Sequence, residues 1–176
     1  MALVVIALTA TIGATAFTTA SLSRDANVNV VSDDKGLLAL TDGTSGGLVA
    51  QNATGALNVD FTAGGAGGVN TNATYELGNP SDPTNQTAFN ITNQDAESHD
   101  ITVKYTGAGG TSDTDANIEF RIYDSTGTKV ATVSEESTSA TISGVASGTT
   151  HYVVIVVDTH GLDSTADLSG TLEVAV

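Results

Sequence analysis

The chain has 176 residues, with 20 Asp and Glu against 5 Lys and Arg, and a formal net charge of -15 at pH 7. A protein this acidic lacks the basic face that nucleic acid or an anionic membrane surface requires. Cysteine is absent, which excludes disulfides and thiolate metal sites. The charge balance suits a high-salt, halophilic environment, where salt screens the repulsion between carboxylates. An acidic secreted protein from an ordinary environment is the alternative.

The N-terminal segment, residues 1–23, is apolar and has no charged side chain before Arg24. Its run Leu3–Leu8 and the small residues Ala14–Ala16 are typical of a signal peptide cleaved before Phe17. A basic start is missing, so two alternatives stay open: a membrane anchor, and a retained segment that packs into another subunit. We therefore divide the chain into this segment and a single β-sandwich domain over residues 24–176.

Beyond Arg24, short β-branched runs alternate with clusters of Gly, Asp, Asn and Ser, a pattern typical of strands and turns. The expected strands are, in chain order, Asn27–Val31, Gly36–Leu40, Leu48–Gln51, Leu57–Thr62, Thr74–Leu77, Ala88–Asn93, Ile101–Thr106, Asn117–Tyr123, Thr128–Val133, Ser139–Ser143, Tyr152–Asp158 and Thr171–Val176.

Periodicity within these runs predicts how they are buried. Ile118, Phe120 and Ile122 alternate with polar residues, which indicates one buried face. Val153–Val157 is apolar on both faces and predicts a central strand. About a dozen short strands at this spacing predict an all-β fold. We expect a β-sandwich of the jelly-roll type, with an extended or helical apolar N-terminal segment.

No constellation of residues predicts an enzyme. Gly43–Gly47 matches G-x-S-x-G, but we expect a strand rather than a helix after it, so a turn is the better interpretation. His99, His151 and His160 have no metal-ligand spacing and are expected at the surface or at strand ends. No carboxylate pair stands beside aromatic residues, so a glycosidase cleft is not indicated, and we expect no small-molecule substrate.

A weak calcium signal lies in mid-chain. Asp113, Asp115 and Asn117 follow the D-x-D-x-N start of a calcium loop. Ile118 stands where such a loop needs Gly, and Asp124 stands where it needs Glu. A solvated acidic loop is therefore the main interpretation, and no cofactor is expected. A Ca²⁺ site between β-loops stays as the alternative.

Four N-x-[ST] sequons favour an exported chain, because N-glycans are added to exposed surface of exported proteins. The candidate acceptors are Asn52, Asn72, Asn85 and Asn90. A fifth site, Asn79-Pro80-Ser81, is blocked by its proline. We expect a secreted protein at the cell surface.

Two segments carry a family resemblance over roughly residues 1–105. One is the opening from Phe17 to Leu40, with Arg24-x-x-x-Val28-x-Val30 followed by acidic residues and a Leu-rich strand. The other is Gly68–Thr74, followed by Phe89–Gln94 with its Ile-Thr-Asn strand. The chain resembles a family of haloarchaeal surface proteins. That family is similar to the TasA and camelysin biofilm-fibre proteins and to the archaeal bundling pili.

The resemblance implies a jelly-roll subunit of an extracellular filament with a role in adhesion or biofilm. In such a homopolymer the N-terminal segment of one subunit inserts as a strand into the next. A sheet with an open edge is completed in this way, and a head-to-tail contact that does not close propagates as a fibre. The implied donor residues are Leu3, Val5, Ile12, Phe17, Val28 and Val30. The alternatives are a monomeric or membrane-anchored glycosylated protein attached to the cell surface, or a calcium-dependent binding module.

Overall fold

The computed structural model describes residues 29–176, except 64, 66 and 108–116. These residues form eleven strands and two short 3-10 helices, η1 (Asp33–Lys35) and η2 (Gly46–Leu48), with no α-helix among them. Every strand pairing between them is antiparallel. The predicted all-β class is confirmed. No helix in the described part of the chain is long and apolar enough to cross a membrane.

The largest sheet has six strands in the order β1-β5-β10-β7-β8, with β4 also paired to β10. Its strands are β1 (Leu38–Asp42), β4 (Thr74–Leu77), β5 (Phe89–Asn93), β7 (Ile118–Tyr123), β8 (Lys129–Ser134) and β10 (Thr150–Asp158). The apolar run Val153–Val157 is buried on both faces of β10, as predicted for a central strand. β5 and β4 lie end to end along one side of β10, on Thr150–Val153 and Ile155–Asp158.

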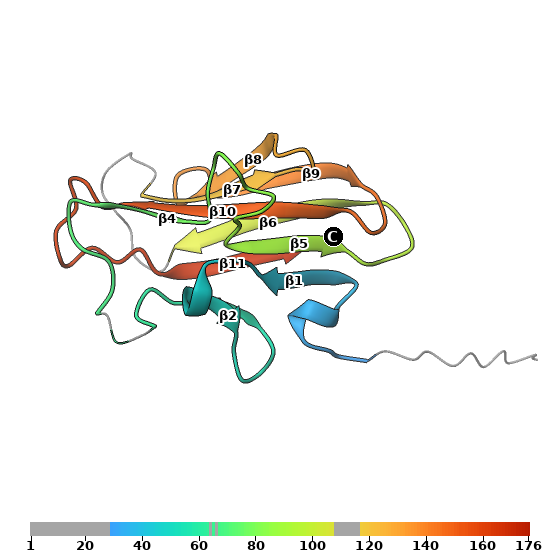
Figure 1. Cartoon of the computed structure of the whole chain (residues 1–176), viewed down its shortest axis with the longest axis horizontal. Coiled ribbons are helices and arrows are strands. Elements are labelled where there is room, and N and C mark those ends of the chain that lie inside the picture. Colours follow the sequence, from blue (N-terminus) through green and yellow to red (C-terminus); the bar gives the residue numbers. More distant parts are fainter. Residues whose placement is uncertain (1–28, 64, 66, 108–116) are drawn as a thin grey trace, which may run out of the picture.

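A three-stranded sheet has the order β11-β6-β9, from β11 (Gly170–Ala175), β6 (His99–Gly107) and β9 (Ser139–Val145). A separate hairpin pairs β2 (Val49–Gln51) with β3 (Leu57–Val59). Residues of the three-stranded sheet, such as Ile101 and Val103, share one hydrophobic cluster with Phe89 and Phe120 of the larger sheet. Alternating side chains of facing strands therefore bury a common core. Figure 1 shows the two sheets with β1 and β2 on one flank.

The two long flanks of the molecule differ. On one flank, β8 ends the six-stranded sheet and β9 ends the three-stranded sheet, and the short turn 135–138 joins them. On the other flank, the β2–β3 hairpin lies beside the edge of β1. Gln51 Nε2 of β2 donates a hydrogen bond to the Leu40 carbonyl of β1 at 2.8 Å. The six-stranded sheet is thus faced by only three strands and a small hairpin, which leaves the second flank incompletely covered.

One expected strand is wrong where the structure describes it. Asn29–Val31, the described part of Asn27–Val31, belongs to no strand, and Val30 is 98% exposed. Its alternation of apolar and polar residues is compatible with a strand, but no neighbouring edge pairs with it. A β-pattern becomes a strand only where a partner supplies hydrogen bonds and a surface to cover.

Candidate functional site

A groove of about 670 Å³ opens on the incompletely covered flank, between the β2–β3 hairpin and β11. Its floor consists of Phe89 of β5, Phe120 of β7 and Val157 of β10, which are at most 3% exposed. Among the described residues, the lining contains no His, Lys or Arg side chain. The floor of the groove is therefore apolar, and the titratable side chains around it are the carboxylates of Asp33, Asp60 and Asp167 and the phenol of Tyr105.

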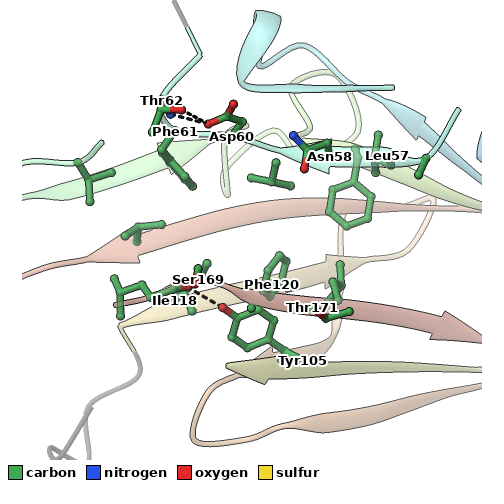
Figure 2. A pocket seen from close by; sticks show the side chains of 18 of the residues that line it. Leu57, Asn58, Asp60, Phe61, Thr62, Tyr105, Ile118, Phe120, Ser169 and Thr171 are labelled. Atoms are coloured by element: carbon green, nitrogen blue, oxygen red, sulfur yellow. Dashed lines mark hydrogen bonds between the residues drawn. The ribbon is translucent and has the colours of Figure 1, made fainter. Parts of the chain in front are cut away.

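One wall of the groove is the strand β3 and the residues that follow it. Leu57, Val59 and Phe61 alternate along this wall and pack partly buried against the core. Asp33 Oδ2 accepts the backbone N–H of Leu57 at 2.7 Å and fixes the hairpin to η1. In Figure 2 the labelled residues from Leu57 to Thr62 form one row and face a second row, which comes from β6, β7, β11 and Ser169 just before β11.

The opposite wall is formed by β11 and Tyr105 of β6. The Tyr105 ring lies 5.2 Å from the Phe120 ring, centroid to centroid, and its hydroxyl donates to the Leu168 carbonyl at 2.7 Å (Figure 2). Burial, with smaller contributions from Glu135 and Asp167, raises the pKa of Tyr105 to about 12. Leu172 contributes a partly buried apolar side chain to this wall. The neutral phenol thus holds the start of β11 against the core.

Both walls have a strand edge without a strand partner among the described residues. β3 pairs only with β2, and β11 pairs only with β6. Edges of this kind present N–H and C=O groups that can pair with a further strand, although on β3 the Leu57 N–H is already bound by Asp33 Oδ2. The groove thus combines apolar surface with main-chain hydrogen-bonding capacity, which is what an extended peptide needs from an acceptor.

The groove also has acidic side chains in its lining. Hydrogen bonds from Thr62 lower the pKa of Asp60, and hydrogen bonds from Ser169 lower the pKa of Asp167. Asp60 Oδ1 accepts the Thr62 hydroxyl at 2.6 Å and its N–H at 2.8 Å. Both carboxylates are therefore charged at neutral pH, and they disfavour an acidic occupant.

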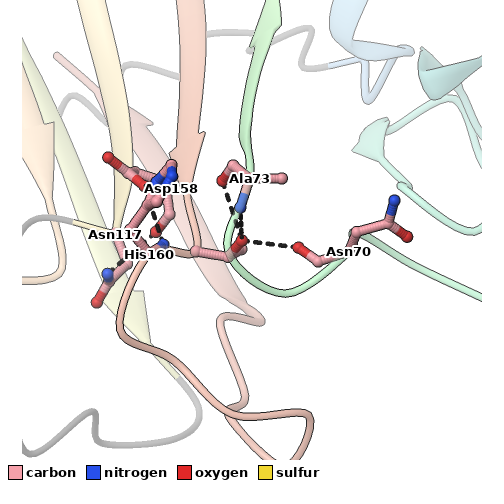
Figure 3. Close-up of polar contacts among 6 residues, drawn as sticks. Asn70, Ala73, Asn117, Asp158 and His160 are labelled. Atoms are coloured by element: carbon pink, nitrogen blue, oxygen red, sulfur yellow. Dashed lines mark hydrogen bonds and ion pairs between the residues drawn. The ribbon is translucent and has the colours of Figure 1, made fainter.

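Of the implied donor residues only Val30 lies within the described chain, and it does not line the groove. Leu3, Val5, Ile12, Phe17 and Val28 lie outside the described residues, and Val30 is exposed outside any strand. Of the calcium residues, Asp113 and Asp115 also lie outside them. Asn117 is 2% exposed, and its Nδ2 donates to the Asp158 carbonyl at 3.0 Å (Figure 3). No group of three or more His, Asp or Glu side chains gathers within the described ranges.

The remaining polar expectations have mixed outcomes. His99 and His160 contact carboxylates at 2.6 Å, Asp95 and Asp158 respectively. His151 is 6% exposed and is the second residue of β10, so of the two expected positions it has the strand end and not the surface. The segment Gly43–Gly47 runs into the three-residue η2, which begins at Gly46, and β2 follows at Val49, so the turn interpretation is confirmed.

The four sequons lie in different environments. Asn52, Asn72 and Asn85 are exposed, whereas Asn90 is partly buried within β5. Asn52 occupies the turn between β2 and β3, Asn72 precedes β4, and Asn85 lies in the connection between β4 and β5. None of the four lines the groove.

Sequence reasoning missed the groove, because its lining comes from segments between Asp33 and Leu172 that only the fold brings together. One signal was available: β11 carries alternating Leu172 and Val174 and contains no Lys or Pro to protect an edge. Comparisons with protein-family models and with curated proteins find no match to this chain.

Proposed function

We propose that the chain is a structural subunit of an extracellular filament, and that the groove accepts the N-terminal segment of a neighbouring subunit as an added strand. The observation that carries this proposal is the apolar groove between two strand edges, β3 and β11, that have no further strand partner in the described chain. Main-chain pairing would supply affinity, and contacts of alternate side chains would supply register.

The contrast between the edges supports an assembly role. The β1 edge is covered by the hairpin through Gln51, and β8 begins with Lys129. β11 has the sequence Gly-Thr-Leu-Glu-Val-Ala, with one charged residue, Glu173, no Lys or Pro, and no covering strand among the described residues. Natural sheets blunt their edges with charge, proline or covering segments, so a weakly protected edge beside an apolar groove favours a strand partner.

The N-terminal segment has suitable chemistry for the groove. Residues 1–23 carry no charge and include Leu3, Val5, Ile12 and Phe17, which would cover apolar walls. The carboxylates of Asp60 and Asp167 disfavour the acidic surface that the rest of the chain presents. Because donor and acceptor lie on different parts of the subunit, the contact is head-to-tail and propagates. The family resemblance implies the same arrangement.

A donor strand would also complete the fold. Placed between β11 and β3, it would join the three-stranded sheet and the hairpin into one layer facing the six-stranded sheet. The jelly-roll sandwich belongs to this proposal, as do export and a place at the cell surface.

The test is negative-stain electron microscopy of the native protein in high salt, with N-terminal sequencing of the same sample. The proposal expects fibres whose subunits begin at or before Phe17 and a variant without residues 1–23 that stays monomeric. Monodisperse full-length protein would refute it and favour a surface-anchored monomer. The volume of the groove also falls in the range of small-ligand sites. A tightly bound apolar molecule in monomeric protein would make ligand binding the function.

A further inference from the structure

We propose that Asn52 is the N-glycan acceptor of this protein, and that Asn85 and Asn90 stay unmodified although they are sequons. The inference rests on the proposed function only in requiring export of the chain; it does not require filament assembly. It follows from the different surroundings of the four asparagine amides.

The Asn52 sequon presents its amide at the tip of the β2–β3 hairpin. Asn52 Oδ1 accepts the N–H and hydroxyl of Thr54 at 2.9 and 2.7 Å, and the N–H of Ala56 at 3.0 Å. The carbonyl oxygen therefore holds the turn, while Nδ2 donates to no protein atom among the described residues. Asn52 and Thr54, the two residues that a transfer enzyme must recognise, are both exposed.

In the sequons of Asn85 and Asn90, the polar side-chain groups form hydrogen bonds within the fold. Asn85 Nδ2 donates to Asp82 Oδ1 at 2.8 Å, and the hydroxyl of its Thr87 is buried 2.7 Å from the Phe89 carbonyl. Asn90 is partly buried, and its Nδ2 donates to Thr41 Oγ1 at 3.2 Å. To recognise either sequon, a transfer enzyme would have to draw the buried Thr87 hydroxyl or the partly buried Asn90 amide out of these contacts.

Asn72 is an intermediate case. It is exposed, with a backbone φ of 57°, but the next residue, Ala73, is tied to Thr159. The Ala73 N–H donates to Thr159 Oγ1 at 2.9 Å, and Thr159 Oγ1 lies 2.9 Å from the Ala73 carbonyl (Figure 3). We expect lower occupancy at Asn72 than at Asn52.

The transfer needs a sugar activated on a membrane-bound polyprenyl phosphate. Asn52 Nδ2 forms a bond to the anomeric carbon of that sugar. The bond from the anomeric carbon to the phosphate oxygen breaks, and the phosphate leaves with the electron pair. Nδ2 gives up one proton to a base, so that atoms and charges balance without oxidation or reduction.

The chain offers a matched control for the turn. Asp124 Oδ1 accepts the N–H and hydroxyl of Thr126 at 2.8 and 2.7 Å, and the N–H of Thr128 at 3.0 Å. This repeats the Asn52 arrangement with a carboxylate. Asn52→Asp is therefore expected to keep the turn while removing the nitrogen that carries the sugar.

The experiment is intact-mass and glycopeptide analysis of the protein purified from its native source, and of variants expressed in that host. Asn52→Asp should lose one glycan mass with an unchanged melting temperature, whereas Asn85→Asp should lose none. Thr54→Ser keeps the hydroxyl and should keep the glycan, which Thr54→Ala should lose. Sugar at Asn85 or Asn90 at or above the level at Asn52 would overturn the inference, as would a chain without sugar. Neither result bears on whether fibres form.

Discussion

Leu172 of β11 offers a way to separate folding of the subunit from its assembly. Its side chain is partly buried against the core and lines the groove, next to the strand edge that would pair with a donor. Leu172→Asp places a carboxylate there. In the open groove water can reach that carboxylate, but an inserted apolar strand would enclose it, so the penalty falls mainly on assembly.

The size of the penalty follows from two routes that the carboxylate can take. If the enclosed carboxylate stays charged and unpaired, the free energy of assembly rises by about 3–5 kcal/mol. If it is protonated instead, protonation at pH 7 of a group with an ordinary pKa of about 3.9 costs about 4 kcal/mol. Either route raises the critical concentration for fibres by about a thousandfold. At pH 5 protonation costs only about 1.5 kcal/mol, so the defect shrinks to roughly tenfold.

The matched control is Ala175→Asp, which adds the same charge to an exposed position on the same strand. Pelleting assays over a range of protein concentrations at pH 7 and pH 5 give the critical concentration, and circular dichroism confirms that each subunit is folded. Equal effects of Leu172→Asp and Ala175→Asp would refute the reasoning. So would a Leu172→Asp defect that does not change between pH 7 and pH 5.

Three further predictions concern the subunit itself. Six aspartates among the described residues have pKa values lowered by hydrogen bonds, so their ionised forms stabilise the folded state. This stabilisation is present above the unfolded pKa of about 3.9 and is lost as the pH falls below it. The urea midpoint of unfolding should therefore be lower at pH 3 than at pH 6. They are Asp60, Asp95, Asp124, Asp158, Asp163 and Asp167. A Cβ at Gly43 would lie 2.2 Å from the Thr87 carbonyl oxygen, whereas one at Gly47 meets no atom within 4 Å. Gly43→Ala should therefore cost about 1–3 kcal/mol in urea unfolding, and Gly47→Ala less than about 0.5 kcal/mol. An absorbance titration should show the Tyr105 phenol ionising at about pH 12, with stability lost as the pH rises from 10 towards that value, and early ionisation of every tyrosine would contradict its burial.

Local pattern was sufficient to predict most strands. Ile118, Phe120 and Ile122 are buried on one side of β7, and the doubly apolar Val153–Val157 lies in the centre of the large sheet. These features depend on the alternation of side chains along one strand, which can be seen in a short stretch of sequence. The strand expected at Asn27–Val31 shows the limit of this reasoning, because its described part has no partner edge.

Partnerships between distant strands could not be predicted in the same way. β8 and β9 are connected by a short turn, as hairpin partners usually are, yet they end different sheets. β10 pairs with two strands, β4 and β5, along the same side. Both arrangements depend on how two layers pack, which no local period encodes. The groove depends on the packing of layers in the same way, because its walls at Leu57 and Leu172 come from distant parts of the chain and carry no shared signal in the sequence.

The position of the groove between β3 and β11 has a consequence for how the proposed filament grows. If each subunit has one acceptor groove and one donor segment, the filament is a linear chain that cannot branch. The two ends of such a chain differ: one has an empty groove, and the other has an unused N-terminal segment. A subunit without residues 1–23 can act only as an acceptor, because it has a groove but no donor segment. Added to growing fibres, it would stop elongation at one end and leave the other end free.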